Sequence, residues 1–326
     1  MNTRRKWMAA GLGLPALAWV DALRAQASAP LVIGWLIPFE GGDGRIARAF
    51  RESMATLGWK EGAQYVTEWR SAQGHLDRLP ALAQEIAASK PAVIVVITST
   101  AARAAMAAAP TTSIVMAIGD PLSSGLVSNL ARPGGRVTGL SNVSRELDLK
   151  CIELLLESVP KLKRVGFLIE STSPSHAAAV TRLRSATEQL RLEAVFSFVA
   201  QPQDVEPAFA RLVKDKVQAL VLPAPGWLGQ FHPQVIGLAL AQRWPVVGTQ
   251  SAIPRQGGLF NYGPDSMALI RRSATYVDRI LKGAKPGDLP IEQPATFELV
   301  LNLKTAKQLG ITFAPAVLAR ATELIE

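Results

Sequence analysis

Cysteine and histidine are scarce in this chain of 326 residues, which contains one cysteine and three histidines. The single cysteine, Cys151, cannot form a disulfide within the chain. His75, His176 and His232 lie far apart, and none has a second histidine or a cysteine two to four residues away, a spacing that zinc sites commonly use. We therefore expect neither an internal disulfide nor a metal site.

The motifs of common enzyme mechanisms are also missing. The sequence has no Gly-x-Ser-x-Gly elbow, no Walker-type phosphate loop and no His-Glu-x-x-His pair. These patterns mark a nucleophile, a phosphate cradle or a metal-activated water. We therefore expect no catalytic residues and no cofactor, and we predict that the protein is not an enzyme.

One segment argues for the opposite conclusion. Residues 42–47 fit the G-x-G-x-x-A dinucleotide fingerprint, lie between a predicted strand and a predicted helix, and are followed by Glu68 at the second strand. However, residues 38–41 separate the first strand from the first glycine, and Asp43 would place a negative charge where a pyrophosphate approaches. An exported nicotinamide-dependent oxidoreductase is therefore the alternative interpretation.

Long runs of one charge are absent as well. The formal net charge is +9, but no five basic residues follow one another, and the densest internal cluster is Lys161, Lys163 and Arg164. No aromatic side chains are interleaved with this cluster, as they would be in many nucleic-acid sites. A solvated basic surface explains it, and we expect no nucleic-acid partner.

The first residues resemble an export signal. Arg4, Arg5 and Lys6 precede the uncharged apolar segment 7–20, and a small-x-small site follows at residues 25–27. The apolar segment has about 14 residues, fewer than the roughly 20 needed to cross a bilayer. We expect a signal peptide over 1–27, cleaved near Ala27 on the twin-arginine or general secretion route. The predicted product is periplasmic, without direct membrane insertion.

From residue 31 onward, short apolar runs rich in β-branched residues alternate with helical stretches. This order predicts an α/β fold of two doubly wound parallel-sheet lobes, with a cleft between them at the carboxyl ends of the strands. The first unit has predicted strands at 31–37, 65–69, 92–97, 113–118 and 137–139, and helices at 46–57, 76–88 and 101–108. The second has predicted helices at 145–158, 176–190, 205–213 and 234–241, and strands at 164–169, 193–198 and 219–222.

Two strand-to-helix turns of this fold contain several hydroxyl groups. Thr98, Ser99 and Thr100 follow a predicted strand, and we expect Thr100 to cap the next helix, whose free N–H groups would attract a carboxylate. In the second unit, Ser173 is a predicted N-cap and Pro174 a first helical residue. Plain helix capping is the alternative at both turns.

Asp120 follows the strand predicted at 113–118, within Gly119-Asp120-Pro121. At the carboxyl end of a strand it would face the cleft, where it could hold a ligand ammonium. Alternatively, its side chain bonds nearby backbone in a turn, as aspartate does readily. The sequence leaves both possibilities open.

Several segments of the sequence resemble those of ABC-transporter substrate-binding proteins, in the group that includes tryptophan- and phenylalanine-binding members. They run over nearly the whole chain after the export segment. These segments are LGWKEG at 57–62, LDRLPALA at 76–83, GDP at 119–121, SGLV at 124–127, RPGGRVTGLS at 132–141, GGLFNYG at 257–263, ILKGAKP at 280–286, DLP at 288–290 and FELVLN at 297–302.

This resemblance implies a type I periplasmic-binding-protein fold, in which two lobes close on a solute by a hinge and deliver it to a membrane permease. It also implies that the chain crosses between lobes near Ser141, near Gly263 and over 295–301. The N-terminal lobe would comprise 30–140 plus 264–294, and the C-terminal lobe 141–263 plus 295–326.

The expected partners are a small solute, an amino acid or a related polar or aromatic metabolite, and an ABC permease in the inner membrane. We expect a monomer. A ligand sensor for a membrane signalling receptor is a further alternative with the same fold. The predicted ligand-binding residues are Thr98, Ser99 and Thr100 for an anionic group, Asp120 for an ammonium, Asn142 and Ser171 for polar contacts from the second lobe, and Phe39 and Tyr262 as apolar walls.

Overall fold

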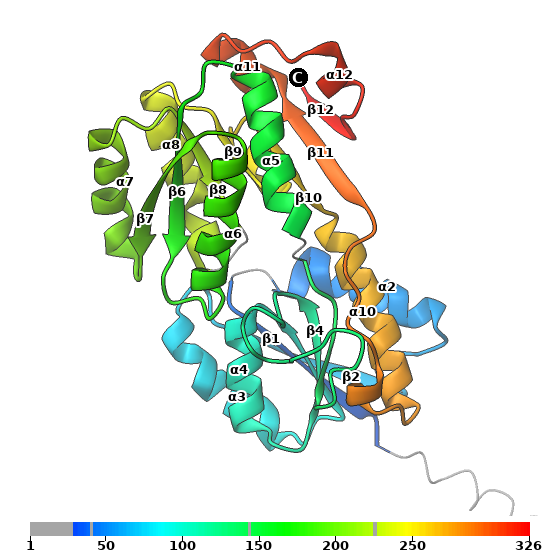
Figure 1. The fold of residues 1–326 in the computed structure, drawn as a ribbon. Coiled ribbons are helices and arrows are strands. Elements are labelled where there is room, and N and C mark those ends of the chain that lie inside the picture. The colour runs from blue at the N-terminus through cyan, green and yellow to red at the C-terminus, as the bar shows by residue number, and fades with distance from the viewer. Residues whose placement is uncertain (1–28, 40–41, 143–144, 224–226) are drawn as a thin grey trace, which may run out of the picture.

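The computed structural model describes residues 29–39, 42–142, 145–223 and 227–326. The segment predicted as an export signal, 1–27, lies outside the described residues. Figure 1 shows two lobes, each built on its own sheet. The first lobe is mainly blue to teal with α10 in orange, and the second is mainly green and yellow with its C-terminal elements in orange and red. The α/β class and the two-lobed architecture predicted from the sequence are confirmed.

The first sheet has five strands in the order β2-β1-β3-β4-β5, and every neighbouring pair is parallel. Its strands are continuous apolar runs because both faces of a parallel sheet are covered by helices. In β1, for example, every residue from Ile33 to Ile37 is buried. The strands are β1 (Leu31–Ile37), β2 (Tyr65–Ser71), β3 (Val93–Ile97), β4 (Ser113–Ile118) and β5 (Val137–Gly139).

Helices cover both faces of this sheet. On one face α2 packs against α10, and α10 packs against β4, while α3 and α4 pack together on the other face. The helix α10 comes late in the chain. Its N-cap residue is Asp265, whose carboxylate accepts hydrogen bonds from the N–H groups of Met267 and Ala268 at 2.8 and 2.9 Å. The helices are η1 (Gly42–Ile46), α2 (Ala47–Thr56), η2 (Leu76–Arg78), α3 (Leu79–Ala88), α4 (Ser99–Ala108), α10 (Ser266–Leu281) and η5 (Pro286–Asp288).

The second sheet has seven strands in the order β12-β11-β10-β9-β8-β6-β7. All its pairs are parallel except β10 with β11, which runs antiparallel. The strands are β6 (Arg164–Glu170), β7 (Glu193–Val199), β8 (Ala219–Leu222), β9 (Val246–Gly248), β10 (Phe260–Pro264), β11 (Phe297–Asn302) and β12 (Glu323–Ile325). The helices around it are α5 (Arg145–Ser158), α6 (His176–Gln189), η3 (Pro202–Asp204), α7 (Val205–Lys214), η4 (Trp227–Phe231), α8 (His232–Ala241), α9 (Ala252–Arg255), α11 (Leu303–Leu309) and α12 (Pro315–Leu318).

Each lobe has its own aromatic core. In the first lobe, the Trp35 ring stacks on Trp69 at a centroid distance of 4.5 Å and meets the edge of Phe50 at 5.0 Å. In the second lobe, Phe167 stacks on Phe196 at 5.0 Å. The buried clusters around these residues draw almost wholly on one sheet and its helices. The hydrophobic burial that stabilises one lobe is therefore largely separate from that of the other.

The chain passes between the lobes at the ends of strands. It leaves the first sheet after β5, returns to it between β10 and α10, and joins the second sheet again at β11 (Figure 1). Gly263 in β10 lies so close to the carbonyl oxygen of Thr249 that an added Cβ would clash with it. No helix in the described ranges is long and apolar enough to span a bilayer.

Candidate functional site

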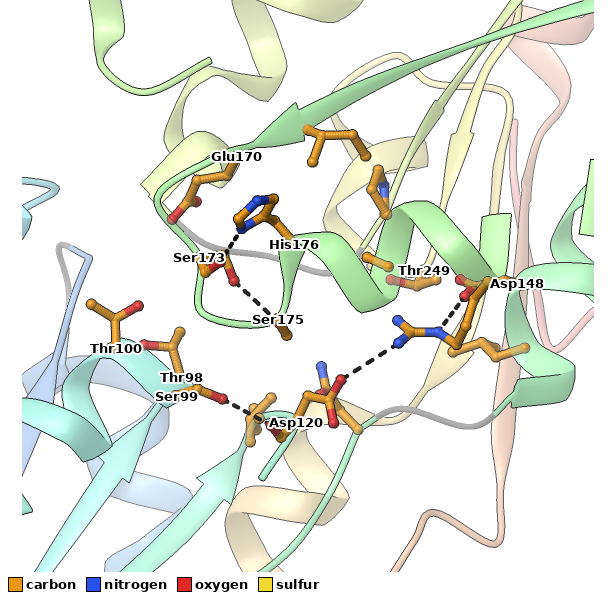
Figure 2. A pocket seen from close by; sticks show the side chains of 18 residues that line it. Thr98, Ser99, Thr100, Asp120, Asp148, Glu170, Ser173, Ser175, His176 and Thr249 are labelled. Atoms are coloured by element: carbon orange, nitrogen blue, oxygen red, sulfur yellow. Dashed lines mark hydrogen bonds and ion pairs between the residues drawn. The ribbon is translucent and has the colours of Figure 1, made fainter. Parts of the chain in front are cut away.

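A cavity of about 90 Å³ lies between the two lobes. It is found where the carboxyl ends of the parallel strands face each other, which is where open α/β sheets bind ligands. Figure 2 shows Thr98, Ser99 and Thr100 on one side of it and Glu170, Ser173 and His176 on the other. The lining residues are Thr98, Ser99, Thr100, Ile118, Gly119, Asp120, Asn142, Leu147, Asp148, Ile169, Glu170, Ser173, Ser175, His176, Ala179, Arg182, Pro223 and Thr249.

Thr98 is the single residue between β3 and α4. Its N–H donates to the carbonyl of Ile118 at 2.8 Å, so the bonding between β3 and β4 continues up to the first residue of the turn. Its backbone has φ 78° and ψ 151°, a region that only glycine adopts freely and that costs a residue with a side chain about 1–3 kcal/mol. Such strain is characteristic of functional sites.

The Thr98 side chain, rather than that of Thr100, caps α4. Its Oγ1 accepts a hydrogen bond from the N–H of Ala101 at 3.4 Å. The prediction that Thr100 is the cap is therefore wrong, because the helix starts at Ser99 without intervening turn residues. Thr100 instead lies in the first turn of the helix and lines the cavity.

Asp120 follows β4 and is buried, with 8% of its surface exposed. Its Oδ1 accepts a hydrogen bond from the N–H of Ser123 at 3.0 Å, which is the turn interaction that the sequence left open. Its Oδ2 makes no hydrogen bond with a described residue, but it lies 3.7 Å from Nη1 of Arg182 in the second lobe. Asp120 therefore forms an ion pair across the cavity.

Arg182 in α6 joins two carboxylates. Besides facing Asp120, its Nε donates to Oδ2 of Asp148 in α5 at 3.0 Å (Figure 2). Burial raises the pKa of Asp148, and the charge and hydrogen bond of Arg182 oppose this shift. The guanidinium thus compensates part of the cost of burying Asp148 and links α5 to the turn after β4.

Glu170 is the last residue of β6, and only 9% of its surface is exposed. Its Oε1 accepts a hydrogen bond from the Thr172 hydroxyl at 3.2 Å, and Oε2 has no hydrogen-bond partner among the described residues. Burial raises the pKa of this carboxyl, while hydrogen bonds from the backbone of Leu228, the hydroxyl of Thr172 and the backbone of Trp227 lower it. No charged neighbour contributes to that shift.

The turn between β6 and α6 differs from the prediction. Ser173 was expected to cap the helix with Pro174 as its first residue, but α6 begins at His176 and its N-cap residue is Ser175, whose side chain makes no capping bond. The carbonyl of Ser173 accepts from the N–H of His176 at 3.1 Å and lies 2.8 Å from the His176 Nδ1. This bonding closes a turn ahead of the helix, so the cap assignment is wrong, while the start of α6 at His176 agrees with the range predicted at 176–190.

The cavity brings together five of the eight predicted ligand-binding residues, namely Thr98, Ser99, Thr100, Asp120 and Asn142. The other three lie outside its lining. Phe39 packs against the core of the first lobe, and Ser171 donates both its N–H and its hydroxyl to the carbonyl of Val199. Tyr262 stacks on Phe297 between β10 and β11 at 5.6 Å. A position near the end of a strand therefore did not suffice to predict that these three side chains line the cavity.

The sequence reasoning overlooked most of the ionisable groups of the cavity. Glu170 stands at the carboxyl end of a predicted strand, the position that α/β folds use for ligands, and this signal was available. His176, Ala179 and Arg182 recur every three residues and so share one face of α6. Among the described residues, no group of three or more histidine, cysteine, aspartate or glutamate side chains could hold a metal ion.

Comparisons with known proteins agree with this architecture. A "Tyrosine-binding protein" from Clostridioides difficile (strain R20291) is 26% identical over 265 residues, covering 81% of this chain and 76% of that protein. A conserved domain protein from Vibrio cholerae superposes with a TM-score of 0.85 at 26% identity, over 90% of this chain and 99% of that one. An ABC domain from Streptococcus pneumonia, solved in complex with L-Trp, gives a TM-score of 0.85 at 25% identity, over 91% and 100% of the two chains.

These neighbours have the type I periplasmic-binding-protein fold, and the present chain shares it. The family model described as "ABC transporter substrate binding protein" matches residues 41–325, which include the second sheet, every strand of the first sheet except β1, and the whole cavity lining. The match therefore includes every element that builds the candidate site, and the chain belongs to the ABC transporter substrate-binding protein family.

Proposed function

We propose that the protein is the periplasmic solute-binding component of an ABC importer. It binds an amino acid, aromatic ones in particular, in the cavity between the lobes and delivers it to an inner-membrane permease. The observation that carries this proposal is the cavity itself, lined by hydroxyl and ionisable groups from both lobes. Similarity to a protein solved with L-Trp and to one named for tyrosine binding supports the choice of ligand.

The lobes must move for such a solute to enter. Ligand pockets commonly have about 300–1,000 Å³, and the cavity of about 90 Å³ is well below this range. We therefore expect the lobes to separate about the crossing segments, admit the solute and close on it. A solute that contacts both lobes favours the closed state by its differential interaction energy.

The carboxylate of the solute is assigned to the start of α4. The N–H groups of Ala101 and Ala102 bond to Thr98, while the first N–H groups of a helix, here at Ser99 and Thr100, have no partner within the helix. Together with the helix dipole, they form a site suited to an anion. Asn142 also lines the cavity and can add a polar contact.

The predicted export signal is consistent with a solute-binding function. The predicted signal over 1–27 would carry the protein to the compartment in which it meets its solute before the permease does. The rival interpretation, a nicotinamide-dependent oxidoreductase, rests on residues 42–47. Membership in a family of substrate-binding proteins favours solute binding over that interpretation.

Calorimetric titration tests the proposal. Protein unfolded, dialysed and refolded to remove bound solute is titrated with L-tryptophan, L-tyrosine and L-phenylalanine, and at least one should bind at a single site. Thr100→Val should weaken binding by about 2- to 10-fold, the effect of one neutral hydrogen bond, while Thr111→Val on the surface should not. Absence of binding by all three amino acids would refute the aromatic amino-acid assignment.

A further inference from the structure

The charges that line the cavity do not balance. Three carboxylates, Asp120, Asp148 and Glu170, face it together with one guanidinium, Arg182. A buried carboxylate is stable in its charged form only beside a cation or several hydrogen-bond donors. The distribution of these partners therefore shows which carboxylate has charge to offer to a solute.

Arg182 is already engaged by two of the three. It hydrogen-bonds Asp148 at 3.0 Å and faces Asp120 at 3.7 Å. Asp120 is held further by the N–H of Ser123 at 3.0 Å. Both aspartates therefore share the charge of one guanidinium, and these contacts join α5, α6 and the turn after β4.

Glu170 has no such cation. Among the described residues it makes no ion pair, its Oε2 accepts no hydrogen bond, and its side chain is about nine-tenths buried in the wall of the cavity. In Figure 2, Glu170 and Asp148 lie at opposite ends of the labelled site. Burial raises the pKa of Glu170, and only hydrogen bonds from Leu228, Thr172 and Trp227 oppose this shift. At Asp148 the charge of Arg182 opposes the corresponding shift.

We propose that Glu170 is the counter-charge for a primary ammonium group of the solute, and that Asp120 instead pairs with Arg182 to hold the two lobes together. This inference rests on the proposed function and names the chemistry that the cavity selects. A solute with an ammonium group would give Oε2 the donor that the protein does not supply. With the carboxylate at the start of α4, the site would recognise a zwitterionic amino acid from both lobes.

The first test changes the solute and leaves the protein intact. The wild-type protein is titrated with the three aromatic amino acids, with their deaminated acids such as 3-phenylpropanoate, and with their decarboxylated amines such as phenethylamine. Loss of the ammonium should weaken binding by about 10- to 100-fold, the range expected for a hydrogen bond to a charged group. Equal affinity for an amino acid and its deaminated acid would overturn the inference.

The second test compares two carboxylates in the same assay. In Glu170→Gln, the preference for the amino acid over its deaminated acid should fall to within about 3-fold. In Asp120→Asn, the affinities for both solutes should change by the same factor, so that the ratio between them stays as in the wild type. The opposite result would refute the proposal. If Asp120→Asn lost the preference for the amino acid over its deaminated acid and Glu170→Gln kept it, the ammonium would be assigned to Asp120.

A third measurement needs no solute. Because Glu170→Gln removes a buried carboxylate without a cation, it should raise the thermal midpoint of the solute-free protein, whereas Glu188→Gln on the exposed face of α6 should not. A lower midpoint for Glu170→Gln would show that the carboxylate is engaged structurally and would contradict the inference. If no aromatic amino acid binds the wild type, the proposed function is refuted in its choice of ligand. The thermal midpoint of Glu170→Gln and the titration of the wild type with the amines then still test the role of Glu170.

Discussion

The two lobes build the cavity with different chemistry, although both face it with the carboxyl ends of parallel strands. The first lobe contributes the hydroxyls and helix start of Thr98–Thr100 and one carboxylate, Asp120. The second contributes ionisable side chains from β6, α5 and α6, including Glu170 and Arg182. In the proposed function, the first lobe would therefore position the solute through backbone groups, while the second would discriminate by charge.

The sheets differ in a related way. The first sheet is wholly parallel, whereas the second carries the antiparallel pair β10 and β11, formed by the segments on either side of the late return to the first lobe. The chain therefore enters the second sheet by more than one route. Movement of the lobes can be absorbed in these crossings while both cores stay intact.

The largest expected effects come from truncating the separate cores. Trp35→Ala in the first lobe and Phe167→Ala in the second remove fully buried stacked rings, and each should cost about 3–5 kcal/mol. If the cores are independent, calorimetry should show two unfolding transitions, of which each variant lowers a different one. Leu122→Ala, at an exposed position, is the control. An equal shift of one common transition by both variants would contradict the separation of the lobes.

A smaller change in the free energy of unfolding should appear at acidic pH, and it comes from His232 in the second lobe. Burial lowers the pKa of His232 to about 4, so the folded protein resists a proton that the unfolded chain accepts near pH 6.5. The neutral form stabilises the fold above pH 6.5, and this stability is lost as the pH falls from 6.5 to 4, by about 3 kcal/mol at most.

Chemical denaturation between pH 7 and 4 measures this contribution through variants. Burial raises the pKa values of Asp148 and Glu170, which acts in the opposite direction, so the wild-type curve alone does not isolate it. His232→Gln should lose less stability than the wild type over this range, and His75→Gln serves as the control. If the free energy of unfolding fell equally with pH in the wild type and in His232→Gln, the histidine would not contribute to the pH dependence of stability.

The smallest effect concerns the contact between the lobes. Asp120→Asn keeps an acceptor for the N–H of Ser123 but removes the charge that faces Arg182 at 3.7 Å, an interaction of about 1 kcal/mol. The solute-free protein should shift toward open forms, detected as a larger radius of gyration in X-ray scattering. The exposed Asp77→Asn provides the comparison, and identical scattering by both variants would mean that the ion pair does not hold the lobes.

Much of the fold was predictable from local pattern. The strand predictions at 31–37, 113–118 and 219–222 match the structure residue for residue, because continuous apolar runs in parallel sheets have few alternatives. The helix starts were less predictable. The helix α4 begins at Ser99, two residues before the predicted range of 101–108, because the bonding between β3 and β4 ends at Thr98. The helix α6 begins at His176, as the range predicted at 176–190 has it, but the expected cap at Ser173 is wrong because Ser173 closes a separate turn.

By itself, the sequence determined the class of the protein, its alternating elements and the strand ends at which a solute site would lie. It also identified Thr98–Thr100, Asp120 and Asn142 as candidates, since hydroxyl, carboxyl and amide groups after strands can face a cleft. Only the tertiary structure decided which charges meet. Arg182 reaches Asp120 from the other lobe, and Glu170 is left without a cation, because pairing between residues distant in the chain depends on the packing of whole lobes and leaves no local pattern.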